Sequence, residues 1–214
     1  MLLLEEIYKS YKAQNSAHFN LRIHRGLGWF KKALELDQDL DFKFISLWIS
    51  FHAIYADDGD IILAPAKLHQ FLETLCQKDL DQKINHIIWE KYSQPIRSLL
   101  DNSYVDQSFW DYRNQKISLE SCQAALESQK KRIQNALQER NSVEILKMIF
   151  HRLYTLHHQL MQGGITYHSS LNHKSFEESC RILAVLLPVF ICILLENAKA
   201  LDLNKPFYPA VQVS

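Results

Sequence analysis

The residues from Asn141 to Gly164 follow a helical pattern that ends on two glycines, and no other feature constrains the fold as strongly. At about 100° per residue, one side of this helix is an apolar arc; the arc comprises Ile145, Leu146, Ile149, Phe150, Leu153, Leu156 and Leu160. A polar stripe lies opposite, within about 60°, and comprises Lys147, His151, His158 and Gln162. His157 stands at the edge of the apolar arc. The arc predicts burial, and the stripe is available to a ligand or a second subunit.

The ends of this helix carry recognisable start and stop signals. Asn141-Ser142-Val143-Glu144 is a capping-box pattern that predicts the first turn. Gly163, followed by Gly164, predicts a left-handed residue that ends the helix. A second capping box, Ser175-Phe176-Glu177-Glu178, predicts a final helix that extends to about Ala200, with a kink at Pro188.

Residues that break helices are scarce, with five Gly and five Pro among 214 residues. Long stretches without them favour helices joined by short loops, so we predict an all-α fold, a bundle of antiparallel helices. Asn20 is expected to cap the second helix, Asp39 or Asp41 the third, and Gly26 and Gly28 to allow close helix packing. Besides the two helices above, the predicted segments are 3–13, 21–36, 42–56, 65–78, 81–92 and 121–139, with short helices and loops over 96–117.

Size and charge limit the possible functions. The length favours one domain with a substantial core. The net charge is zero with histidine neutral, which argues against a protein that binds nucleic acid non-specifically over its whole surface. Any contact with RNA would therefore involve a local patch of the surface.

The sequence favours a soluble, cytoplasmic protein without membrane contact. Cys76, Cys122, Cys180 and Cys192 form no CxxC pair, which is typical of reduced thiols. The first residues lack a basic segment and become acidic too early for a signal peptide. The apolar run 182–195 is shorter than the roughly 20 residues of a spanning helix, so it predicts a core helix.

The histidine-rich end of the helix allows three interpretations. A metal site is disfavoured because His157 and His158 are adjacent, about 100° apart, and no acidic or thiol ligand lies nearby in the sequence. Metal-independent RNA cleavage is a second interpretation, because imidazoles suit both proton transfers that this reaction needs. The third is a polar helix end without chemistry, and residue types alone favour it. No cofactor is expected.

Several segments resemble a bacterial branch of the HEPN family (higher eukaryotes and prokaryotes nucleotide-binding). In that branch, the stretch corresponding to 157–164 reads R-N-Q-L-V-H-G-G, where this chain has H-H-Q-L-M-Q-G-G. The segments 22–30, 44–56 and 181–190 are also similar to that branch. The resemblance covers about 20–200 and is weak over 60–140. It implies a single HEPN-like domain over 1–214, with an extended tail over about 201–214.

The resemblance implies a homodimer in which the motifs of two subunits share one cleft. In active members the Arg and His of the motif cleave RNA without metal. Such proteins often serve as toxins paired with a cognate antitoxin or in phage defence, and others are binding or regulatory modules that have lost catalysis.

This chain departs from the family motif at the positions that carry its chemistry. His157 stands where the family has Arg, His158 where it has Asn, and Gln162 where it has His. Glutamine cannot take up a proton near neutral pH, and histidine is a weaker phosphate ligand than an Arg fork. We therefore expect a degenerate ribonuclease motif in an RNA-associated or partner-binding regulatory protein.

Two alternatives stay open. A shifted R-x4-H motif runs from Arg152 to His157, and an active endoribonuclease would use His157 and His158 with Arg152 on the phosphate. Lys147 and His151, on the polar stripe, are further candidate phosphate ligands. The other alternative is a purely structural interaction protein.

Overall fold

A computed structural model describes residues 1–56, 65–201, 203, 205, 206 and 208. Within them the regular elements are helices, without a β-strand, which confirms the predicted all-α bundle. The α-helices are α1 (Leu2–Lys12), α2 (Ala17–Leu34), α3 (Leu40–Tyr55), α4 (Pro65–Lys78), α5 (Lys83–His86), α6 (Ser93–Asp101), α7 (Gln107–Arg113), α8 (Leu119–Gln138), α9 (Ser142–Met161) and α10 (His173–Glu196). A π-helical segment, η1 (Ile87–Lys91), and a 3-10 turn, η2 (Ser103–Val105), complete the described elements.

The chain divides into two compact units. The first comprises Met1–Lys83 and Leu183–Ser214, and the second Ile84–Ile182. Helix α10 therefore contributes its first half to the second unit and its second half to the first. The single-domain boundary of 1–214 stays a prediction, and most of the predicted tail lies outside the described residues.

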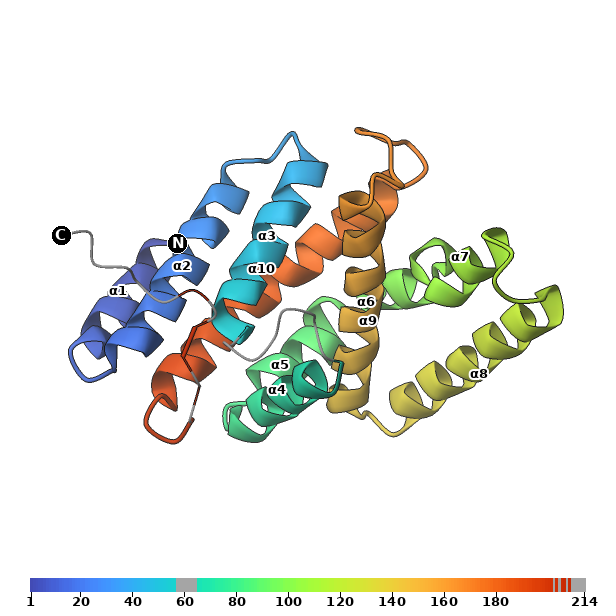
Figure 1. Ribbon diagram of the computed structural model, residues 1–214. Helices are drawn as coiled ribbons and strands as arrows, with labels where there is room; N and C mark the ends of the chain where they lie inside the picture. The colour runs from blue at the N-terminus through green and yellow to red at the C-terminus, as the bar shows by residue number, and fades with distance from the viewer. Residues whose placement is uncertain (57–64, 202, 204, 207, 209–214) are drawn as a thin grey trace. The chain divides into compact units, whose positions relative to one another are not determined.

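Helices α2 and α3 form the main helix pair of the first unit, beside each other in Figure 1. They approach closely at Gly26, where an added Cβ would lie 2.6 Å from Cγ2 of Ile54. The hydroxyl of Ser50 donates a 2.7 Å hydrogen bond to the Gly26 carbonyl. Gly26 thus permits the close approach that its sequence position predicted, whereas Gly28 has open space around it.

The sequence 42–56 is apolar on most sides, which predicts a central helix, and α3 is buried along most of its length. Phe44, Leu47, Phe51 and Ile54 are fully buried. Arg22 of α2 is also buried, and its guanidinium donates to the Ala56 carbonyl at 2.6 Å. A cation at the carbonyl end of α3 satisfies groups that the helix itself leaves unpaired. The sequence Asp57-Asp58-Gly59-Asp60 predicts a solvated turn after this helix, and these residues lie outside the described part of the chain.

Helix α10 is the one described helix that is long and apolar enough to cross a membrane. However, 67% of its most apolar window is buried inside the protein, as in the core helix of a soluble protein. Phe176, Leu186 and Phe190 are among its buried residues. This agrees with the interpretation of residues 182–195 as a core helix.

Helix α9 forms the core of the second unit and contacts α6, α8 and η2. Six of the seven residues in the predicted apolar arc are almost completely buried: Ile145, Leu146, Ile149, Phe150, Leu153 and Leu156. Burial of this arc fixes which side of the helix remains accessible, and the candidate site lies on that side.

Two helix starts differ from the sequence prediction. Ser16, and not Asn20, caps α2 by accepting from the Phe19 amide at 3.2 Å. Asn20 lies inside the helix, where its side-chain amide donates to the carbonyls of Lys12 and Asn15. The final helix begins at His173, two residues before the predicted Ser175.

The segment predicted as one helix over 81–92 is divided. Four α-helical residues from Lys83 precede η1, and α6 then begins at Ser93 with Pro95 in its first turn. A proline is tolerated there because amides of the first turn have no partner within the helix.

Candidate functional site

The motif helix α9 begins with half of the predicted capping box. The side chain of Asn141 accepts a hydrogen bond from the Glu144 amide at 3.1 Å. The carboxylate of Glu144 does not return this bond, because it pairs with Lys147 at 3.0 Å and Arg132 at 3.4 Å. The pairing with Lys147, followed by that with Arg132, lowers the pKa of Glu144.

The helix ends in a complete Schellman motif. Gly163 has a φ of +70°, its amide donates to the Leu160 carbonyl at 3.1 Å, and the Gly164 amide donates to the Gln159 carbonyl at 2.8 Å. These bonds satisfy two of the final carbonyl groups. The sequence prediction of a left-handed Gly163 is confirmed, and the site therefore lies on a sharply defined helix end.

His157 and His158 occupy different environments. His157 is half-buried, and desolvation, with a smaller contribution from the neighbouring His158, lowers its pKa to about 4. Its imidazole is therefore neutral near neutral pH. His158 is exposed, and its ring lies 6.0 Å from the Tyr154 ring, with an angle of 21° between their planes. Of the two histidines, only His158 faces solvent freely.

The two glutamines of the motif have different surroundings. Gln162 is exposed at the end of the helix, and its backbone N–H donates to the His158 carbonyl. Gln159 donates from Nε2 to the Tyr104 carbonyl at 2.9 Å. That carbonyl also accepts a 2.7 Å bond from the indole of Trp110. Gln159 therefore attaches the motif helix to the segment around η2, while Gln162 is available for contact.

Arg152 has a structural environment. It is 5% exposed, forms an ion pair with the fully buried Asp106, and donates to the Leu100 carbonyl at 3.2 Å. Asp106 in turn accepts from the Ser108 amide at 2.8 Å. The structure thus directs the guanidinium of the shifted R-x4-H motif into the interior, away from the exposed side chains of His158 and Gln162.

The remaining candidates follow the predicted polar stripe. His151 is exposed, and Lys147 is half-buried beside Glu144. A phosphate approaching Lys147 would also meet the carboxylate of Glu144. The polar stripe therefore carries little unbalanced positive charge along α9.

Asp106 and Tyr104 were not predicted from the sequence, although both bind side chains of the motif helix. They lie far from that helix in the sequence. The sequence did contain one indication for Arg152, because its position falls within about 40° of both Ile145 and Leu156, at the edge of the apolar arc. A charged residue at such a position requires a buried partner.

The arrangement can offer one exposed imidazole, one exposed carboxamide and the stacked ring of Tyr154. It can donate and accept hydrogen bonds and can stack against a planar group. Within one chain it does not provide the acid, base and cation that phosphodiester cleavage uses together.

Comparison of the chain with protein-family models, with curated proteins and with solved structures finds no match.

Proposed function

We propose that this chain is a HEPN-like, dimeric, cytoplasmic protein whose ribonuclease motif has degenerated. It retains a regulatory or binding role, either with RNA or with a cognate protein partner, in a system of the defence or toxin–antitoxin type. Its homodimer joins the ends of two α9 helices.

The observation that carries this proposal is the state of the motif side chains. His157 is neutral and half-buried, and Gln162 is exposed but cannot transfer a proton. Arg152 is held by Asp106. Because none of these three groups can supply a proton or a free positive charge near neutral pH, the site supports recognition better than cleavage.

The surface around the motif end supports contact with a partner. Met161, directly beside Gln162, is 59% exposed, and Tyr167 and Leu171 of the following loop are each 58% exposed. Large exposed apolar side chains are a feature of protein interfaces, and these three lie within ten residues of one another in the sequence.

An RNA cleavage assay tests the proposal. The purified protein is incubated with single-stranded RNA in EDTA, and products with 2′,3′-cyclic phosphate ends are sought. We expect none. Cleavage that disappears in His158→Ala but persists in the control His173→Ala would overturn the proposal in favour of an active endoribonuclease.

Restoring the family motif tests whether the fold can still support the ribonuclease reaction. The triple change His157→Arg, His158→Asn and Gln162→His is expected to create metal-independent cleavage in a folded dimer. The double change without Gln162→His is the matched control and is expected to stay inactive. A folded, dimeric triple variant without activity would favour a purely structural interaction protein.

A further inference from the structure

Positive charge is concentrated at the beginning of this neutral chain. Residues 7–34 contain six Lys and Arg and no Asp or Glu, although the chain has 24 of each class. The same stretch contains His18 and His24. Residues 7–34, which include the C-terminal half of α1 and all of α2, therefore form a basic element within a protein whose net charge is zero.

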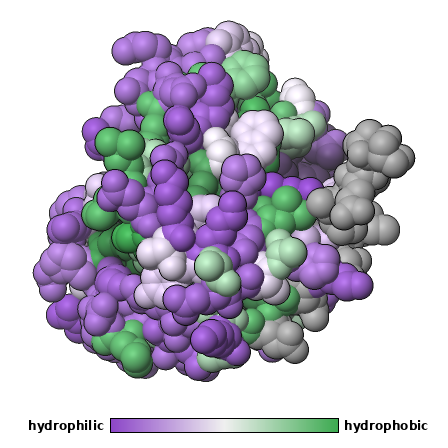
Figure 2. Space-filling view, turned by 90° about the vertical axis from the view of Figure 1, so that its left-hand side faces the viewer, coloured by the Kyte–Doolittle hydropathy of each residue, from purple (hydrophilic) through white to green (hydrophobic). Residues whose placement is uncertain are grey.

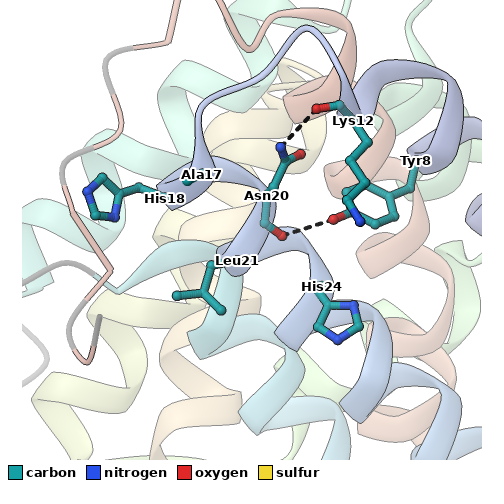
Figure 3. A pocket seen from close by; sticks show the side chains of 7 residues that line it. All are labelled: Tyr8, Lys12, Ala17, His18, Asn20, Leu21 and His24. Carbon is teal, nitrogen blue, oxygen red and sulfur yellow. Dashed lines mark hydrogen bonds between the residues drawn. The ribbon is translucent and has the colours of Figure 1, made fainter. Parts of the chain in front are cut away.

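A pocket of about 350 Å³ lies within this basic element. Its lining residues are Tyr8, Lys12, Ala17, His18, Asn20, Leu21 and His24, labelled in Figure 3. All of them fall within 7–34, so no carboxylate lines the pocket. The side of the molecule that carries α1 is largely hydrophilic in Figure 2, with scattered apolar residues. Most of the pocket surface is apolar, and its polar side chains are those of Tyr8, Lys12, His18, Asn20 and His24.

The pocket has a preformed wall. The Tyr8 hydroxyl donates to the Asn20 carbonyl at 3.2 Å, and Asn20 Nδ2 donates to the Lys12 carbonyl at 2.9 Å. These bonds join the C-terminal half of α1 to the first turns of α2 (Figure 3). Burial raises the pKa of the Tyr8 hydroxyl, which keeps it protonated as a donor.

Polar groups in the pocket remain available to a ligand. Among the described residues, Lys12, His18 and His24 make no ion pair, and their side chains are exposed. Lys12 and His24 lie on the Tyr8 side of the pocket in Figure 3, and His18 lies opposite. The Oδ1 atom of Asn20 is buried and, within the described part of the chain, accepts no hydrogen bond.

We propose that this pocket binds a small phosphorylated compound that also carries a hydroxyl group. The phosphate contacts the Lys12 ammonium and the imidazole N–H of His24, because charge-assisted hydrogen bonds to phosphate are the strongest available there. The hydroxyl donates to Asn20 Oδ1, which satisfies the buried acceptor. The site lies in the first unit and does not depend on the function proposed for α9.

Titration of the full chain with glycerol phosphate, followed by calorimetry and amide NMR shifts, tests the site. We expect saturable binding with shifts at residues 8–24, weaker binding of inorganic phosphate and none of glycerol. Lys12→Gln should weaken binding about tenfold, the equivalent of one charge-assisted bond. Lys9→Gln, which removes the same charge from the same helix, should change it less than about twofold. Absence of binding, or equal losses in both variants, would overturn the proposal.

Two further arms keep the result unambiguous. His24→Ala should also weaken binding, which provides a second readout if Lys12→Gln fails to fold. Short RNA with a 5′-phosphate and the same RNA with a 5′-hydroxyl distinguish a terminal phosphate group from the RNA backbone. Competition with glycerol phosphate by the first RNA alone supports the phosphate site. The phosphate site would be contradicted if both RNAs bind equally and if Lys9→Gln weakens this binding as much as Lys12→Gln does. That pattern indicates a diffuse basic surface.

Discussion

Arg152 and Asp106 form a buried ion pair that fixes the motif helix α9 to the start of α7. Each partner has a second bond, from Arg152 to the Leu100 carbonyl and from the Ser108 amide to Asp106. The pair therefore joins three segments of the second unit, and it explains why an arginine lies on the apolar side of α9.

We expect Asp106→Ala to destabilise the protein strongly. Removal of one partner leaves the Arg152 charge buried and unpaired, which costs about 3–5 kcal/mol. Chemical denaturation followed by circular dichroism measures this loss. Asp101→Ala, at the exposed end of α6, is the matched control and should change the free energy of unfolding by less than about 0.5 kcal/mol. Similar losses in both variants would contradict the structural role of the pair.

The low pKa of His157 predicts a pH-dependent stability. With a folded pKa of about 4, the unfolded chain binds a proton at His157 between roughly pH 6.5 and 4, whereas the folded protein does not. Keeping His157 neutral in the folded protein therefore contributes to stability fully above that pH range, and this contribution is lost as the pH falls through it. A shift of one pKa unit corresponds to about 1.4 kcal/mol of unfolding free energy. Because this half-buried ring is partly screened by solvent, we expect the loss of unfolding free energy on acidification to be about 1–2 kcal/mol.

NMR titration of the histidine side chains checks this prediction directly. The His157 resonance should titrate near pH 4. The stability of His157→Gln should fall less steeply than that of the native protein over the same pH range. A His157 resonance that titrates near pH 6.5 would show that the ring is not desolvated.

The left-handed conformation of Gly163 predicts a graded response to substitution. Gly163→Ala should cost about 1–2 kcal/mol, because a Cβ disfavours a positive φ. Gly163→Asn should cost less, since asparagine adopts this conformation more readily. Denaturation curves of the two variants test this order. Equal losses would indicate that the Schellman geometry is not the cause.

The contact between α2 and α3 predicts opposite effects at two neighbouring glycines. Gly26→Ala should destabilise by about 1–3 kcal/mol, because the new methyl group overlaps the buried Ile54. Gly28→Ala meets open space inside the same helix and should stabilise by up to about 1 kcal/mol. Thermal unfolding compares the two variants. Stabilisation of both would contradict the close approach of these helices.

Helix periodicity predicted the fold class and the buried face of α9, because both depend on local spacing. The Gly163 stop and the Asp39 cap were predictable for the same reason. Asn20 was misassigned as a cap because its side chain satisfies carbonyls at the end of α1, a contact that depends on how the loop folds back.

The features that local patterns missed depend on contacts between distant residues. Arg152 and Asp106 lie 46 positions apart, and Gln159 reaches Tyr104 across 55. Likewise, the π-helical turn at η1 has no breaker in its sequence. The pocket between α1 and α2 depends on how two helices pack, which the pattern of either helix alone does not show.

Sedimentation velocity over a range of protein concentrations tests the central proposal most directly, because the proposed site joins the ends of two α9 helices. We expect a dimer at micromolar concentration that Met161→Glu converts to a monomer. Leu80→Glu, at a residue 86% exposed in the first unit, should remain dimeric. A protein that stays monomeric at every concentration would contradict the account.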